Sequence, residues 1–562
     1  MSLGGTRLCL AAAIVCTLAG SAAAPARAAA AAHPCLVVTG NDDPTFARNF
    51  NPFEVGTAMD FTLGGIYEPL VIVTAAGGGR QYDWLASAFA WSRDRRTLTL
   101  TVRRGVRWSD GVPLTAADVA YTLTAGRQSK AMDQIGLTRR GNEVVSVRAV
   151  GADEVAIRLD RADSQFVSAV LAGVVVVPEH VFAHVKNVGA WSNRDPVGTG
   201  PFDVVRQFGT QSYTLGRNPH YWQPGVPRFS CIQRIASSSA ESALFQMLAG
   251  AVDLTNDLFP NVQKAYVAHD PAHFHYYYPA EAPGVGLFLD DTVYPFSLVA
   301  LRKAISLAID RPKLTLAEYR YAPPVDALGI DRIWPQWLTA SAAAEARSLA
   351  TYDPDAARRV LLVAGFTYAG TTLVDPHGDP VKIDAIVPGG WPDWYADMGL
   401  ISDELRSIGI DFSVDAKPDF GAWYPDAAAI KEATILWDNA GDTASPYVYF
   451  KEHLDPASFV PPGRDASATG NWERFGDPAA VPLLEAFRST ADPAAQHRIA
   501  GRLENLFLAD LPFVPLFAEP TWSTYSTRHF TGFPSAADDY VQPDFQTSPE
   551  YVVALTRIRP RG

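Results

Sequence analysis

The chain has 562 residues, of which 48% are hydrophobic and 19% are charged, and its formal net charge is −13 at pH 7. This length is enough for two or three domains, and the composition is that of a globular protein, which excludes disordered and fibrous classes. An acidic chain without a block of lysines or arginines also argues against nucleic acid and anionic membrane surfaces as partners.

The first 32 residues differ in composition from the rest. Arg7 is followed by an apolar run at residues 8–19 and by an alanine-rich tract with several A-x-A sites. This pattern is typical of a secretory signal peptide, cleaved between about residues 24 and 32. Losing Arg7 and Arg27 changes the net charge from −13 to −15. The sequence shows no L-A-G-C lipobox and no other run of about 18 apolar residues, so we expect a soluble periplasmic protein.

Two cysteines remain after the predicted leader, which contains Cys9 and Cys16. Cys35 and Cys231 form an even pair in an oxidising compartment, which favours a disulfide. That bond would join the first strand of the mature chain to a strand near residue 231. The alternative is two separate buried thiols.

Residues 91–123 have the pattern of a strand, a turn and a capped helix. Threonine alternates with leucine or valine over residues 97–102, which is the period of a half-buried strand. The sequence WSDG at residues 108–111 is typical of a tight turn. Thr115 then has the position of a helix N-cap, and Asp118, three residues later, completes a capping box.

Further strands and helices alternate along the chain. Strands are predicted at residues 35–39, 144–159 (a hairpin), 174–177 and 410–414. Helices are predicted at residues 239–250, 297–309 and 395–408. Three more helices begin with Asp-Pro, with the aspartate as N-cap, at Asp353, Asp477 and Asp492. This alternation indicates α/β lobes around mostly parallel or mixed sheets.

A series of motifs also gives a family resemblance. They are NFNPF at residues 49–53, IYEPLV at 66–71, the stretch 91–123, VGTGPF at 197–202, NPHYW at 218–222 and RKAI at 302–305. In these motifs and their order the chain resembles the family 5 extracytoplasmic solute-binding proteins of ABC importers, which include peptide-, nickel- and oligosaccharide-binding members. The resemblance implies an α/β, two-lobed, periplasmic-binding-protein-like fold with a hinge and an extra subdomain in the first lobe.

The resemblance also implies a division of the chain. After a signal peptide at residues 1–32, it places the first lobe at 33–283, with an insert subdomain at about 70–195, the second lobe at 284–511 and a return to the first lobe at 512–562. The implied function is a monomeric receptor that captures a solute between the lobes by hinge closure and delivers it to the permease subunits of an ABC transporter. No cofactor is predicted.

Residues for catalysis or metal binding do not stand out. The sequence lacks G-x-S-x-G, H-E-x-x-H and C-x-x-C, and no nucleophile–base pair rises above the background, so an enzyme is not predicted. His269, His273 and His275 are the best metal candidates, but no carboxylate partner is evident and no metal site is predicted.

Tryptophans in polar stretches are the strongest binding signal, at residues 388–394, 436–442 and 470–475. Indole faces beside amide, carboxylate and guanidinium groups suit a ligand with flat apolar faces and many hydroxyls. The predicted ligand-binding residues are Trp391, Trp394, Trp437, Asn439, Asp442, Asn471, Trp472 and Arg474. These stretches resemble the oligosaccharide-binding branch of the family, so an oligosaccharide is slightly favoured.

Other interpretations stay open. The ligand of the same receptor would be an oligopeptide if Asp442 pairs with a peptide amino terminus, although Thr443-Ala444-Ser445 departs from the peptide-binding pattern. A secreted polysaccharide hydrolase would also use tryptophans, and would need two carboxylates about 5–10 Å apart. Each tryptophan could instead simply fill the core.

Overall fold

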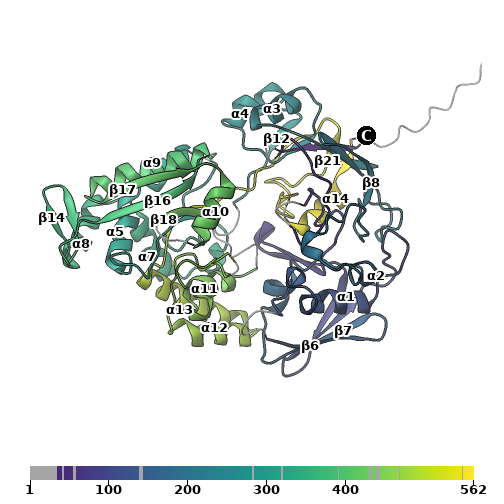
Figure 1. The fold of residues 1–562 in the computed structure, drawn as a ribbon, viewed down its shortest axis with the longest axis horizontal. Coiled ribbons are helices and arrows are strands. Elements are labelled where there is room, and N and C mark those ends of the chain that lie inside the picture. The colour runs from purple at the N-terminus through teal and green to yellow at the C-terminus, as the bar shows by residue number, and fades with distance from the viewer. Residues whose placement is uncertain are drawn as a thin grey trace, which may run out of the picture.

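Two bodies, each with its own sheet and core, make up the computed structural model (Figure 1). The structure describes residues 35–40, 43–54, 58–137, 143–280, 284–317, 321–389, 391–429, 433–437, 444–467, 469–546 and 548–561. The predicted signal peptide lies outside these ranges. Among the described helices, none is both long enough and apolar enough to cross a membrane.

The first body contains a seven-stranded mixed sheet in the order β12-β20-β11-β1-β10-β9-β8. Its strands are β1 (Leu36–Thr39), β8 (Val204–Phe208), β9 (Ser212–Gly216), β10 (Cys231–Ile235), β11 (Leu254–Thr255), β12 (Phe274–Tyr276) and β20 (Thr524–Ser526). Strand β1 is parallel to both of its neighbours, β10 and β11. Because β20 comes from the last part of the chain, segments that are distant in sequence complete one sheet.

The predicted disulfide is present at one end of this sheet. Cys35 precedes β1 and Cys231 begins β10, and the two are bonded with their Cα atoms 4.4 Å apart. The parallel register sets Leu36 opposite Ile232, so the cysteines next to them come together.

A second, four-stranded antiparallel sheet in the first body has the order β4-β5-β7-β6. Its strands are β4 (Ala86–Trp91), β5 (Thr97–Val102), β6 (Val144–Val150) and β7 (Glu154–Leu159). Along β5 the leucines and the valine are buried and the threonines are half-buried, as the alternation predicts. Helix α1 (Ala116–Thr124) follows, and its predicted capping box is confirmed, because Thr115 Oγ1 accepts from Ala117 N and Asp118 Oδ2 accepts from Thr115 N.

The strand predicted at residues 174–177 is wrong. These residues are buried, but their pairing is limited to one bridge between Pro69 and Val175. Leu70 N donates to Val174 O and Val176 N donates to Glu68 O. Pro178 has no N–H group to donate at the next position, so the ladder cannot extend beyond it.

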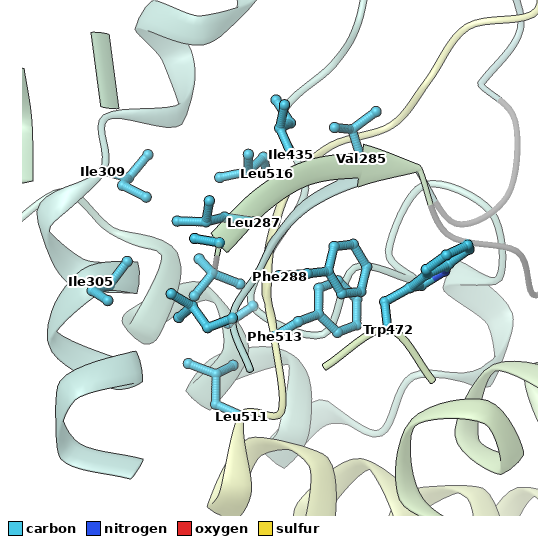
Figure 2. Packing of buried hydrophobic residues seen from close by; sticks show 14 of the residues in the cluster. Val285, Leu287, Phe288, Ile305, Ile309, Ile435, Trp472, Leu511, Phe513 and Leu516 are labelled. Atoms are coloured by element: carbon cyan, nitrogen blue, oxygen red, sulfur yellow. The ribbon is translucent and has the colours of Figure 1, made fainter. Parts of the chain in front are cut away.

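The second body has a five-stranded sheet in the order β17-β16-β18-β13-β19. Its strands are β13 (Val285–Phe288), β16 (Lys382–Pro388), β17 (Asp411–Lys417), β18 (Ala433–Trp437) and β19 (Val514–Phe517). Strand β16 is parallel to β17 and β18, whereas β13 is antiparallel to β18 and β19. Figure 2 shows part of the core around β13 and β19, where the rings of Phe288 and Phe513 stack at 4.4 Å and Trp472 lies at the edge of the cluster.

The predicted helices occur close to their expected positions. They are α3 (Ala240–Leu248), α5 (Val299–Ala308), α8 (Pro354–Val363), α9 (Pro392–Ser407) and α13 (Pro493–Asp510). Asp353 and Asp492 are N-caps, as predicted. Asp477 is not, because α12 (Ala480–Ser489) begins only after a turn in which Asp477 Oδ1 accepts from Ala479 N.

The chain passes between the two bodies twice. It leaves the first body after β12 and enters the second at β13, and it returns between β19 and β20. The two cores are separate. Residues 285–517 supply the core of the second body, and residues 36–254 and 525–558 supply the main core of the first.

Candidate ligand-binding site

Three connections leave the parallel part of the second sheet at one edge, and two of the predicted tryptophans lie there. Trp391 and Trp394 come directly after β16, and Trp423 belongs to α10 (Phe420–Ala429), which follows β17. Because parallel strands end at a common edge, segments that are far apart in sequence meet there, and this edge is where α/β sheets commonly bind ligands.

The tryptophan side chains form one cluster. The rings of Trp391 and Trp394 lie edge to face with centroids 4.8 Å apart, and Trp394 and Trp423 do so at 5.9 Å. Tyr424 extends the cluster to Trp472, at 6.2 Å. Two of the predicted site residues, Trp391 and Trp394, are thus joined to a third, Trp472, through two residues that the sequence reasoning missed. The only signal for these two was the aromatic pair at residues 423–424 within a polar stretch.

The members of this cluster differ in how far they are buried. Trp394, Trp423 and Trp472 are at most 2% exposed, whereas Trp391 and Tyr424 are half-buried. Asp393 lies between the first two tryptophans in sequence, its Oδ1 accepts from Trp394 N at 2.9 Å, and burial raises the pKa of its carboxyl group. A ligand at this edge would therefore meet Trp391 and Tyr424, with the other rings as a rigid support.

The polar side chains of the loop at residues 470–475 hydrogen-bond to backbone groups of this loop and of neighbouring segments. Asn471 Nδ2 donates to the carbonyl oxygens of Glu452 and Phe475, each at 2.7 Å, and Asn471 Oδ1 accepts from Phe475 N. The guanidinium of Arg474 donates to three further carbonyl oxygens, those of Asn471, Ala428 and Arg464. Both side chains are buried, so these bonds hold the loop against α10 and α11 (Tyr447–Leu454).

The middle tryptophan stretch is only partly described. Trp437 is the last residue of β18 and lies opposite Val285. Its side chain, and the predicted residues Asn439 and Asp442, lie outside the part of the chain that the structure describes.

A second aromatic group lies where the chain passes between the bodies. Tyr278 contacts Tyr276 at 4.9 Å, Tyr321 at 5.2 Å and Trp522 at 4.9 Å between ring centroids. Tyr276 and Trp522 keep exposed surface. The sequence reasoning missed this group because its members come from three separated segments, and only the Tyr-Tyr-Tyr run at residues 276–278 marks it.

The histidines near this group have other partners. His273 Nδ1 lies 3.0 Å from Asp270 Oδ1, so it does have a carboxylate partner, contrary to the sequence interpretation. His275 Nε2 lies 3.2 Å from Thr527 Oγ1. Within the described ranges, no three His, Cys, Asp or Glu side chains are grouped so that they could hold a metal ion.

The motifs of the first body meet around Glu68. Its carboxylate accepts from Trp84 Nε1 at 2.7 Å and from the side chains of Tyr221 and Trp222 at 3.1 to 3.2 Å. Arg103 covers the ring of Trp222 at 4.6 Å. Together with neighbouring residues, Trp84, Trp222 and Arg103 line a hollow of about 800 Å³. Burial raises the pKa of Glu68 to about 7.

The architecture defines the class of protein. A mixed α/β fold of two bodies linked by two chain crossings, with aromatic residues at the carboxyl edge of one sheet, is the predicted periplasmic-binding-protein-like fold. The fold is similar to that of a periplasmic oligopeptide-binding protein of Thermotoga maritima, with TM-score 0.82 and 23% identity over 94% of this chain and 99% of that chain. A structure of the same Thermotoga maritima protein with mannohexaose bound gives TM-score 0.79 and 23% identity over 94% of this chain and 98% of that chain.

The family model for bacterial extracellular solute-binding proteins, family 5, matches residues 81–459, and the chain belongs to this family. Among curated relatives, a nickel-binding periplasmic protein of Escherichia coli is 26% identical over 66% of this chain and 69% of its own length. A glutathione-binding protein of the same species is 23% identical over 82% and 83%. The protein is thus a family 5 solute-binding receptor of an ABC importer, and the family consists of substrate-binding proteins rather than enzymes.

Proposed function

We propose that this receptor captures an oligosaccharide between its two bodies and delivers it to the permease subunits of an ABC importer. The observation that carries the proposal is the aromatic cluster at the carboxyl edge of the second sheet. Trp391 and Tyr424 offer partly exposed rings there, backed by the buried rings of Trp394 and Trp423. Rigid aromatic faces beside a carboxyl group, such as that of Asp393, match the alternating apolar faces and hydroxyls of a sugar chain.

The proposal includes a division into lobes. Residues 33–283 and those after β19 form the first lobe, with an insert at about 70–195, and residues 284–517 form the second, because β19 pairs with β13 of the second body. The crossings near residue 284 and between β19 and β20 act as the hinge, and closure about them buries the ligand. The receptor works as a periplasmic monomer after its leader, residues 1–32, is cleaved. Trp437, Asn439 and Asp442 remain predicted ligand contacts. Asn471 and Arg474 act by shaping the loop rather than by touching the ligand.

A peptide is the second candidate ligand. The glutathione-binding relative favours it by similarity. The Thermotoga maritima protein is named as oligopeptide-binding, but one of its structures holds mannohexaose, which favours the sugar. A thermal-shift screen with mannohexaose, cello- and malto-oligosaccharides, glutathione, short peptides and Ni²⁺ separates these classes, because a ligand that binds only the folded state raises the melting temperature. Stabilisation by peptides without any effect of sugars would contradict the proposal.

Trp391→Ala is the sharpest mutational test of the site. We expect it to weaken binding of the stabilising oligosaccharide by roughly 1–3 kcal/mol, because a stacked anchor ring is lost from the ligand contact. Titration calorimetry measures the change. Trp191 is a half-buried tryptophan that packs on Phe182 in the first body. The matched control is Trp191→Ala, and this variant should bind the oligosaccharide with unchanged affinity.

Trp472→Ala should behave differently from Trp391→Ala. Trp472 is fully buried, so its removal should cost about 3–5 kcal/mol of folding stability through the cavity it leaves. Equal affinity of the Trp391 variant and the wild type would remove Trp391 from the site.

A further inference from the structure

A polar contact joins the two bodies at a place distinct from the two chain crossings. It lies between the β6–β7 part of the first body and α12 of the second, which are neighbours in Figure 1. Four charges alternate in it. Arg488 pairs with Glu143 of the first body and with Glu485 of its own helix, and Arg161 of the first body reaches both glutamates at 3.1 Å.

The Arg488–Glu143 pair at the centre of this cluster is buried, whereas Arg161 and Glu485 are 43% and 46% exposed. The side chain of Arg488 is 4% exposed and that of Glu143 is 16% exposed. Isolated exposed pairs contribute little, but removing one partner of a buried pair leaves an uncompensated charge. Desolvation lowers the pKa of Arg488 to about 10, so its guanidinium stays charged at neutral pH. Separating the two bodies would return these charged groups to water. Removing one charged side chain while the bodies stay together leaves its partner buried and unpaired, which is unfavourable.

Neutral hydrogen bonds continue the contact on both sides of the charges. Ser164 N donates to Arg488 O at 2.6 Å, and Gln496 Nε2 donates to Ser164 Oγ at 3.2 Å. Ser445 Oγ donates to Gln165 Oε1 at 2.8 Å, and both of these side chains are buried. The four first-body residues therefore lie within residues 143–165, and their partners lie within residues 445–496.

The Gln165–Ser445 bond links the first body to the segment that leads into α11 of the second body. Ala444, the neighbour of Ser445, accepts a hydrogen bond from Trp337 Nε1 of the second body at 3.3 Å. Ser445 also leads into α11, whose Tyr447 packs on Phe487 of α12.

We propose that these residues form an interbody latch that favours the arrangement of the two bodies seen in this structure, taken as the closed, binding-competent one, with Gln165 as the positioning residue for Ser445. The interbody latch comprises Glu143, Arg161, Ser164, Gln165, Ser445, Glu485, Arg488 and Gln496. It rests on the proposed function only in taking closure as the binding motion. Because affinity scales with the fraction of molecules in the binding-competent state, the latch sets ligand affinity without contacting the ligand.

Small-angle X-ray scattering on the ligand-free protein tests the latch directly. We expect a larger radius of gyration for Arg488→Gln and for Gln165→Ala than for the wild type, and an expansion of the wild type when NaCl rises from about 0.1 to about 1 M. Arg358→Gln is the matched control, because Arg358 pairs with Asp355 at 3.0 Å within one body. Gln165→Ala also removes the bond from Gln165 Nε2 to Ser164 Oγ at 3.2 Å, so Ser445→Ala should expand the protein no more than Gln165→Ala does, and the double variant should show less than the sum of the two effects because both changes break the Gln165–Ser445 bond.

A second readout separates positioning from general stability. Circular dichroism identifies variants that fail to fold, and Gln165→Ala, which removes no charge, carries the test if Arg488→Gln does not fold. Folded latch variants should bind mannohexaose about 3- to 10-fold more weakly than the wild type, whereas Arg358→Gln should not. An unchanged radius of gyration in Gln165→Ala and in wild type at high salt would overturn the latch. Expansion without binding of mannohexaose or of any other sugar in the thermal-shift screen by the wild type would instead retain the latch and reject the sugar.

Discussion

At the scale of single residues, Glu68 shows how hydrogen bonds of one buried side chain link two sequence motifs. It receives three hydrogen bonds from Trp84, Tyr221 and Trp222, and these partners belong to stretches up to 154 positions away. The carboxyl group therefore ties the IYEPLV motif to the NPHYW motif. Burial is the main cause of its pKa of about 7, against an ordinary value of 4.5.

This pKa predicts a pH dependence of stability. Between pH 4.5 and about 7 the folded state holds a proton on Glu68 that the unfolded chain releases, so the contribution to stability is complete below pH 4.5 and is lost as the pH rises through 7. In Glu68→Gln the unfolding free energy should therefore depend less on pH. Its change between pH 4.5 and about 7 should shrink by up to about 3 kcal/mol. Urea unfolding from pH 4 to 8 measures it. The exposed Glu345 gives the control Glu345→Gln, and equal slopes in both variants would contradict the assignment.

At the scale of elements, the turn at residues 197–202 depends on two glycines that pack directly on another backbone segment. Gly200 N donates to Ile66 O at 2.9 Å, and Phe202 N donates to Gly65 O at 3.0 Å. A Cβ on Gly198 would lie 2.1 Å from Ile66 O, and one on Gly200 would lie 2.2 Å from Gly65 O. The glycines are needed for close approach, which explains the VGTGPF sequence without any phosphate-binding role.

Gly200→Ala should therefore destabilise the protein by about 3 kcal/mol or more, since the backbone of residues 65–66 must move. Gly399 is the matched control, because it is exposed within α9 and an added Cβ would meet nothing within 4 Å. Gly399→Ala should stabilise by roughly 0.5–1 kcal/mol through the lower entropy of the unfolded chain. Denaturant midpoints compare the two, and a neutral Gly200→Ala would show that this turn can relax.

Local elements also show what sequence patterns predict well. The capping box of Thr115 and Asp118 and the N-caps Asp353 and Asp492 were all predictable, because their partners lie within a few residues. Asp477 has the same Asp-Pro sequence but caps a turn instead, since α12 begins two residues later than that pattern indicates. The strand predicted at residues 174–177 failed because Pro178, directly after it, cannot donate to a ladder, so pairing is limited to one bridge between Pro69 and Val175.

At the scale of the whole molecule, the disulfide and the returning strand β20 connect distant parts of the first body. The Cys35–Cys231 bond closes a loop with a sequence separation of 196 residues. Loop-closure entropy makes such a bond stabilising by about 2–5 kcal/mol. The second body contains neither cysteine and has its own core.

Reduction should thus lower the melting temperature of the first body more than that of the second. Scanning calorimetry with and without a reductant, together with the Cys35→Ser/Cys231→Ser double variant, measures the shift. We expect the reduced wild type and the double variant to melt alike. A reductant effect that persists in the double variant would point to a cause other than this bond.

The sequence by itself determined the family, the α/β fold class, most helix starts and the pairing of the cysteines. The fold class and helix starts follow from local hydrogen bonds and periodicity, the family from ordered motifs, and the cysteine pairing from the presence of only two cysteines after the predicted leader. Only the tertiary structure decided which aromatic rings keep exposed surface. It buried Trp472, left Trp391 half-buried, and turned Asn471 and Arg474 inward to backbone carbonyls. It also brought Gln165 to Ser445 across 280 positions. Burial and long-range partners depend on how distant segments pack, and no spacing within one stretch of chain encodes them.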